Sequence, residues 1–258
     1  MKKPTMAIQL FTLRDHIQNA EDFDKTLERL QTMGVKDVQI SSIGDIPAEV
    51  QKEILNKHGM KVCLTHKSYD WMKSDINAVI EHHKIIGCND VGIGMAPPEN
   101  RWNYENVERF ISSINDLAVK FKEQGITLNY HNHAFEFYRL DDYKYNMMDM
   151  ILNETDPDLL KIVFDVAWAD YAGADPVEMM KKLKNRIKVL HFKDYTFDRD
   201  GHLKFVSLGK GAVDLRACYE AACELEIPYI AYEQDNHWVD GDAFKATEQS
   251  WDFMQSLI

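Results

Sequence analysis

The 258-residue chain has no apolar run approaching the ~18 residues that a membrane-spanning helix needs. Two lysines near its start are followed by Gln9, Thr12 and Arg14, which interrupt what would have to be the apolar core of a signal peptide. No Pro-rich or Gly/Ser-rich stretch divides the chain. We therefore expect one domain over residues 1–258, in the cytoplasm and away from membranes.

Cysteine and basic residues are both scarce. The four cysteines form no C-x-x-C pair, which excludes a disulfide framework and argues against structural zinc. Lys and Arg number 30 against 42 Asp and Glu, a net charge of −12. Because affinity for nucleic acid rests on clustered basic side chains, we expect no nucleic-acid partner.

A repeated theme fills the chain: an amphipathic helical stretch, a glycine or short polar break, and a short β-branched run. Gly34, Gly59, Gly87 and Gly125 stand where a helix would end in the left-handed conformation, and a strand follows each. The pattern predicts strands at 7–12, 38–41, 61–65, 90–93, 126–131, 161–165, 187–192 and 229–233.

Helices are predicted between these strands, at 22–33, 47–57, 73–86, 103–123, 145–154, 176–184, 215–225 and 242–256. Strict alternation of eight strands with helices predicts a parallel sheet and a single (β/α)₈ TIM barrel of the α/β class. A doubly wound open sheet would carry a glycine-rich turn after its first strand, and residues 12–15 contain no glycine. Residues 195–210 break the rhythm and predict a β-hairpin after the seventh strand.

In such a barrel the active site forms at the carboxyl ends of the strands. Asp165, His191 and Glu233 end three consecutive predicted strands at equivalent depths, which predicts a ligand set of two carboxylates and one imidazole. Oxygen and nitrogen donors together suit one divalent ion: Mn²⁺, Mg²⁺, Co²⁺, Fe²⁺ or Zn²⁺. The alternative is that each residue is separately a strand-end carboxylate or a hydrogen-bonded histidine.

The fifth strand offers several further groups. Period-two alternation puts His131 and His133 on one face, while Glu136 follows in the loop and could fold back. Either His131 or Glu136 is the expected fourth ligand, which leaves His133 as a general base or acid. Alternatively, one of the two histidines only hydrogen-bonds backbone at the barrel rim.

Other polar strand ends are candidate substrate contacts, namely Gln9, Gln39, Ser41, His66 and Lys193. His66 faces the same mouth, and its alternative role is a hydrogen bond at the rim. Lys193 could neutralise an oxyanion or bind phosphate, or it could form a structural ion pair with Asp194. Two histidines of the third predicted helix, His82 and His83, are expected to face solvent.

Six motifs together resemble the xylose isomerase-like barrels, a family that includes sugar isomerases and epimerases, inosose dehydratase and endonuclease IV. They are YHNHAFEF at 130–137, FDVAW at 164–168, AGADP at 172–176, HFKD at 191–194, LGKG at 208–211 and EQD at 233–235. The resemblance covers nearly the whole chain. It implies one divalent cation, with ligand roles that carry over to Asp165, His191 and Glu233.

Two departures from the family bear on the chemistry. Many relatives have a histidine three residues after the aspartate, whereas this chain has Trp168, which predicts stacking on a sugar ring. Epimerases of the family use two metal-bound glutamates, of which only Glu233 is clearly inherited, with His131 standing where the other would be.

The resemblance implies a sugar isomerase or epimerase that acts on a keto-sugar through an enediolate, with Glu233, His133 and His131 as catalytic groups. A dehydratase or lyase of a keto-sugar, keto-glycoside or keto-inositol is the alternative, and a non-catalytic sugar-binding barrel is a third interpretation. Endonuclease IV needs a larger metal cluster and a basic face. Barrels of this kind pair through outer helices, so a homodimer is the default expectation.

Overall fold

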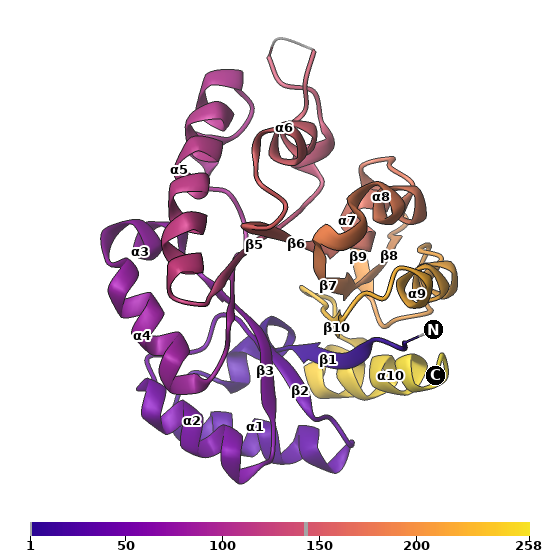
Figure 1. Cartoon of the computed structure of the whole chain (residues 1–258). Coiled ribbons are helices and arrows are strands. Elements are labelled where there is room, and N and C mark those ends of the chain that lie inside the picture. Colours follow the sequence, from indigo (N-terminus) through magenta and orange to yellow (C-terminus); the bar gives the residue numbers. More distant parts are fainter. Residues whose placement is uncertain (1, 142–143) are drawn as a thin grey trace.

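Eight parallel strands close into a barrel in the computed structural model, which describes residues 2–141 and 144–258 (Figure 1). Around the barrel the order is β1, β10, β7, β6, β5, β4, β3 and β2. The strands are β1 Thr5–Gln9, β2 Asp37–Ile40, β3 Lys61–Lys67, β4 Asp90–Ile93, β5 Thr127–His131, β6 Leu160–Asp165, β7 Ile187–Phe192 and β10 Tyr229–Tyr232. The prediction of a single (β/α)₈ barrel is confirmed.

Helices surround the strands, and both chain termini lie beside α10 (Figure 1). Their bounds are α1 Ala20–Thr32, α2 Ala48–Lys57, α3 Tyr69–Ser74, α4 Ile76–Ile86, α5 Tyr104–Glu123, α6 Met147–Glu154, α7 Val166–Tyr171, α8 Pro176–Leu183, α9 Leu215–Glu224 and α10 Ala243–Gln255. Short 3₁₀ turns add η1 Leu10–His16, η2 Pro98–Asn100, η3 Phe135–Phe137, η4 Lys184–Arg186 and η5 Val239–Gly241. None of these described helices is long and apolar enough to cross a membrane.

The core has two layers because each strand is covered on both faces. The barrel interior is filled by small and branched side chains, namely Ala7, Cys63, Leu64, Val163, Val189 and Ala231. A much larger layer of aliphatic and aromatic side chains, such as Phe23, Phe110 and Phe121, packs between strands and helices. Burial on both faces explains why the strands read as short continuous apolar runs.

The predicted hairpin after the seventh strand is present as β8 Asp194–Phe197 paired antiparallel with β9 Leu203–Val206. The Asp194 carboxylate fixes the return of this hairpin by accepting backbone N–H bonds from Tyr195, Gly209, Gly211 and Val213. A Cβ on Gly211 would lie 2.2 Å from Asp194 Oδ1, so glycine is required there. The LGKG motif therefore closes around one buried carboxylate.

Two local predictions needed correction. The predicted helix at 73–86 is two helices, because Asp75 ends α3 and its side chain caps α4 by accepting from the Ala78 N–H. His83 was expected to face solvent and is instead fully buried, where its imidazole bonds to Thr65 Oγ1 at 2.8 Å and to the Val79 carbonyl. His82 beside it is half-buried.

Candidate metal centre

Four side chains converge at the carboxyl ends of four neighbouring strands. His131 ends β5, Asp165 ends β6, His191 lies near the end of β7, and Glu233 directly follows β10. One ligand atom of each lies within 4.8 Å of the others, and all four residues are buried. Asp165 and His191 are register partners on adjacent strands. The strand-end pattern therefore brings together the predicted trio and one of the two candidates for a fourth ligand.

His131 and Asp165 each direct toward the group one atom that makes no hydrogen bond, and at Asp165 this oxygen meets, among the described residues, only the Lys193 ammonium and the two imidazoles. His131 Nδ1 donates to the Gly94 carbonyl at 2.8 Å, so in the neutral imidazole Nε2 carries the lone pair, and Nε2 has no hydrogen-bond partner. That Nε2 lies 3.5 Å from Asp165 Oδ2. Asp165 Oδ1 is occupied by the Trp168 N–H at the start of α7. Buried atoms left free in this way fit ligation of a cation.

His191 is held by Gln39 from the opposite side of the barrel. Its Nε2 donates to Gln39 Oε1 at 2.9 Å, while the Gln39 amide donates to His66 Nε2 at 3.0 Å. His191 Nδ1 faces Glu233 Oε2 at 3.1 Å. With Nε2–H engaged by the amide, the Nδ1 lone pair points toward the group, as a metal ligand requires. The fully buried Gln39 is thus a positioning residue rather than the substrate contact that the sequence predicted.

Lys193 supplies a buried positive charge to the group. Its Nζ lies 2.9 Å from Glu233 Oε2, 3.2 Å from Asp165 Oδ2 and 3.1 Å from Asp235 Oδ2. The predicted alternative of an ion pair with Asp194 is wrong, because neighbouring residues alternate in direction and Asp194 binds backbone N–H groups instead. Asp235 was not singled out from the sequence as a partner of Lys193.

These contacts shift the acidities of the group. Burial opposes ionisation of Asp165, but Lys193 and His131 together lower its pKa to about 2. Burial likewise opposes the charged form of Glu233, whose pKa is held well below its usual value by Lys193 and His191. Burial disfavours the ammonium of Lys193, yet three carboxylates raise its pKa. The site is a fixed arrangement of ionised carboxylates around a permanent cation.

Glu136 lies outside the four-residue group. The η3 turn directs its carboxylate back under the strand, where it accepts from Tyr130 Oη at 2.6 Å and from the His133 N–H at 2.8 Å. Burial raises the pKa of Glu136 to about 7. The structure therefore brings His131, and not Glu136, to the other three side chains.

His133 and Trp168 stand next to each other at the rim, with ring centroids 5.5 Å apart. His133 lines a cavity at the mouth of the barrel, and its Nδ1 has no hydrogen-bond partner. Burial, with His131 nearby, lowers the pKa of His133 well below its usual value, so this imidazole is neutral. Gln9 is fully buried and its side chain accepts from the Phe11 N–H, which keeps it away from the cavity lining.

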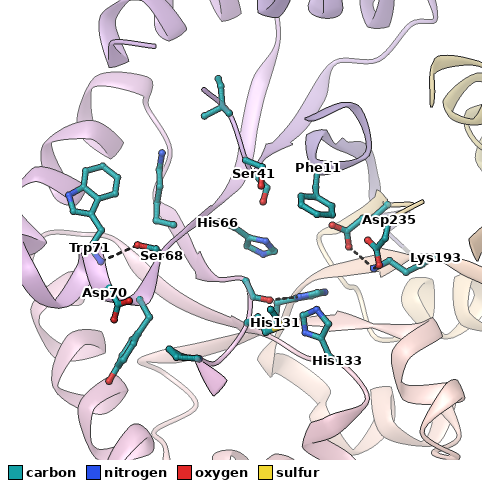
Figure 2. Close-up of a pocket in the computed structure, with 18 residues that line it drawn as sticks. Phe11, Ser41, His66, Ser68, Asp70, Trp71, His131, His133, Lys193 and Asp235 are labelled. Carbon is teal, nitrogen blue, oxygen red and sulfur yellow. Dashed lines mark hydrogen bonds and ion pairs between the residues drawn. The ribbon is translucent and has the colours of Figure 1, made fainter. Parts of the chain in front are cut away.

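A cavity of about 910 Å³ opens above the group. Figure 2 shows Lys193 and Asp235 on one side of it, His66 in the middle, and Ser68, Asp70 and Trp71 on the other side. His66, His131, His133, Lys193 and Glu233 all line it. A volume near the upper end of ordinary ligand sites, roughly 300–1,000 Å³, leaves room beyond a single sugar ring.

Residues 23–257 match the family of xylose isomerase-like TIM barrels. The chain belongs to this family. An inosose dehydratase of Clostridium perfringens is 26% identical over 195 residues, which cover 67% of this chain and 63% of that protein. The chain thus aligns with less than two thirds of the length of this relative.

Two solved structures share the fold over nearly the whole chain. A sugar phosphate isomerase/epimerase of Parabacteroides distasonis superimposes with a TM-score of 0.80 at 22% identity, covering 99% of this chain and 97% of its own. An IolI protein whose structure holds a zinc atom superimposes with a TM-score of 0.72 at 15% identity, covering 98% and 97%. The predicted resemblance to the family is confirmed.

Proposed function

We propose that this chain is a divalent-metal-dependent enzyme that removes the proton next to a ketone in a sugar or a cyclic polyol. The observation that carries the proposal is the convergence of His131, Asp165, His191 and Glu233 within 4.8 Å at the mouth of the barrel. The inosose dehydratase and the sugar phosphate isomerase/epimerase to which the chain is similar are named for such substrates, which supports the proposal.

A divalent cation held by these four side chains would supply the positive charge that makes a proton beside a carbonyl acidic. The chain supplies the remaining groups. His133 lines the cavity as a neutral imidazole with a free Nδ1, so it can accept that proton. Lys193 Nζ lies beside Glu233 and can donate a hydrogen bond to the oxygen on which negative charge develops.

Among the outcomes open to such a carbanion, the site favours elimination, as in a dehydratase or a lyase. An imidazole, His131, stands where an epimerase of this family would offer a second glutamate, so Glu233 is the only glutamate in the ligand group. The cavity extends beyond the group, which leaves space for a departing substituent. The inosose dehydratase relatives support the same outcome.

Isomerisation or epimerisation is the second candidate, and one observation favours it. Glu233 and His133 line the same cavity, so two groups that can carry a proton are available to one substrate. Returning the proton to a neighbouring carbon, or to the other face, needs two such groups.

The test begins with the metal content of purified protein, measured by elemental analysis for the wild type, Asp165→Asn and Glu233→Gln. Asp175→Asn is the matched control, because Asp175 caps α8 as Asp165 caps α7 but lies outside the group. We expect about one equivalent of metal in the wild type and the control, and little in the other two. A wild type that binds no Mn²⁺, Co²⁺ or Zn²⁺ after incubation would contradict the proposal.

The reaction is then followed with keto-sugars in D₂O. Elimination releases the β-substituent and leaves an unsaturated ketone that absorbs in the ultraviolet. Isomerisation or epimerisation instead gives a deuterated product that keeps the substituent.

A further inference from the structure

The cavity has a second end, at the carboxyl end of β3 and the start of α3. Lys67, Ser68, Asp70 and Trp71 line it there. In Figure 2, Ser68, Asp70 and Trp71 lie across the cavity from Lys193 and Asp235, with His66 between the two sides. This end therefore belongs to the same cavity but contains none of the four clustered side chains.

Lys67 is a cation without a carboxylate partner at this end. Over residues 2–141 and 144–258, no carboxylate oxygen lies within 4.0 Å of Lys67 Nζ, the distance that defines an ion pair. Asp70, which lines the same end of the cavity, forms no ion pair with Lys67 either. Lys67 Nζ contacts the His82 imidazole, with Nε2 at 3.4 Å, and the Trp71 ring, whose centroid is 5.5 Å away. Lys193, by contrast, contacts three carboxylates.

The surroundings of Lys67 make an unpaired ammonium unfavourable. Burial lowers its pKa to about 8, and burial also lowers the pKa of His82 to about 3, so the neighbouring imidazole is neutral. A half-buried charge that faces a cavity gains from an anionic partner, because a charge removed from water is costly unless it is paired. The lining around Lys67 supplies no such partner, and a ligand in the cavity can.

The direction of Lys67 separates this end from the metal group. His66 and Lys67 are successive residues of β3, so their side chains leave opposite faces of the strand. His66 points inward and contacts Gln39, whereas Lys67 points toward α3 and α4 and contacts Trp71 and His82. A ligand group bound by Lys67 is therefore not the group that meets the metal.

We propose that Lys67 and the Ser68 hydroxyl form a subsite for a carboxylate on the substrate, at the far end of the cavity from His131, Asp165, His191 and Glu233. A carboxylate fits better than a phosphate for two reasons. One ammonium balances one negative charge, and among the described residues that line the cavity there is no arginine to balance a second. Asp70 on the same lining would further disfavour a dianion.

This subsite rests on the proposed function only in assuming that the substrate reacts at the metal centre, at the other end of the cavity. Binding energy from such a remote group serves to orient the reacting end of the substrate. The substrate class becomes a keto-sugar or cyclic keto-polyol that carries a carboxylate away from its reacting carbons.

The experiment compares three unreactive sugars, D-glucose, D-glucuronate and D-glucose 6-phosphate, by ligand-detected NMR titration. In the wild type we expect glucuronate to bind about tenfold or more tighter than glucose, the size of one hydrogen bond to a charged group. Lys67→Met removes this preference, and Lys67→Arg, which keeps the charge, retains it. Lys73→Met is the matched control, because Lys73 lies on α3 and packs on the Tyr69 ring but does not itself line the cavity.

Two results would overturn the subsite. The subsite is wrong if the wild type binds glucuronate no more tightly than glucose, or if Lys67→Met keeps the preference for glucuronate. Either result would show that Lys67 does not recognise a carboxylate. A Lys67-dependent preference for glucose 6-phosphate over glucuronate would replace the carboxylate with a phosphate.

The same titration on Asp165→Asn separates this inference from the proposed function. If the proposal of a metal centre is wrong, the Lys67-dependent preference for glucuronate is still observed. If the proposal of the subsite is wrong, metal binding and turnover are still observed.

Discussion

Replacing Gln39 with methionine tests how the metal centre is held together. The Gln39 amide links His191 to His66 through two hydrogen bonds, of 2.9 Å and 3.0 Å, inside the barrel. Methionine keeps the length of the side chain but neither hydrogen bond. Without the acceptor, His191 is free to carry its proton on Nδ1, the nitrogen that faces Glu233, and that nitrogen then cannot bind a metal.

The expected loss in metal affinity for Gln39→Met is about 10–100-fold, the usual effect of removing a hydrogen-bond partner from a ligating histidine. Leaving the fully buried His191 Nε2–H unsatisfied costs a further ~1–3 kcal/mol in folding stability, whereas His66 lines the cavity and can bond to water there. Gln39→Glu separates the two effects, because a carboxylate still accepts from His191 Nε2–H but no longer donates to His66. We expect this variant to bind metal at least as tightly as the wild type.

Metal affinity is measured by competition with a chelating dye, and folding by thermal melting of the metal-free protein. Gln51→Met is the control, since Gln51 on α2 is also buried and donates to the Ile46 carbonyl just before that helix, away from the metal group. It should lose stability without losing metal affinity. A Gln39→Met protein that binds metal within twofold of the wild type would refute the assignment of His191 Nδ1 as the ligand atom.

Two further predictions concern the rim of the barrel. Asp194→Asn places an NH₂ group among the backbone N–H donors of Gly209, Gly211 and Val213. We expect the free energy of unfolding to fall by ~1–3 kcal/mol and a protease to cleave the hairpin sooner. An unchanged melting temperature and cleavage rate would argue that Asp194 does not anchor the hairpin. Burial raises the pKa of Glu136 from 4.5 to about 7, so at pH values between these two the folded chain binds a proton that the unfolded chain does not. The free energy of unfolding therefore falls as the pH rises from about 5 to 7, by up to ~1.4 kcal/mol per pH unit. Urea titrations should show that the unfolding free energy of Glu136→Gln depends less steeply on pH than that of the wild type. Equal slopes for the two proteins would disprove the raised pKa of Glu136.

The barrel and most of its metal group were predictable because both follow from short-range regularities. Glycines after helices and eight buried apolar runs predict the strand order, and parallel strands bring their carboxyl ends to one rim. Asp165, His191 and Glu233 could thus be grouped before any coordinates were known. His83 could also have been placed correctly, since it lies four residues after Val79 on the buried face of α4.

Other features depend on conformation that no periodicity encodes. The choice between His131 and Glu136 is made by the η3 turn, which directs the Glu136 carboxylate to Tyr130. The role of Gln39 depends on contacts across the barrel from β2 to β7, strands that are not neighbours in the sheet. Sequence alone therefore gave the residue types at the rim but not which nitrogen or oxygen each turns inward.

The charges at the mouth of the barrel support a divalent ion over a purely organic site. Asp165, Glu233 and Asp235 surround Lys193, and whenever both imidazoles are neutral, the form that binds a metal, the single ammonium leaves two negative charges uncompensated. Buried charge of one sign is costly, and no other cation forms an ion pair with these three carboxylates within the described residues. One divalent cation beside Asp165 Oδ2 and His131 Nε2 would supply the missing charge, and it would also supply a partner for His131 Nε2, which has no hydrogen bond. Lys193 would then keep Asp235 as its partner and remain free to meet the substrate.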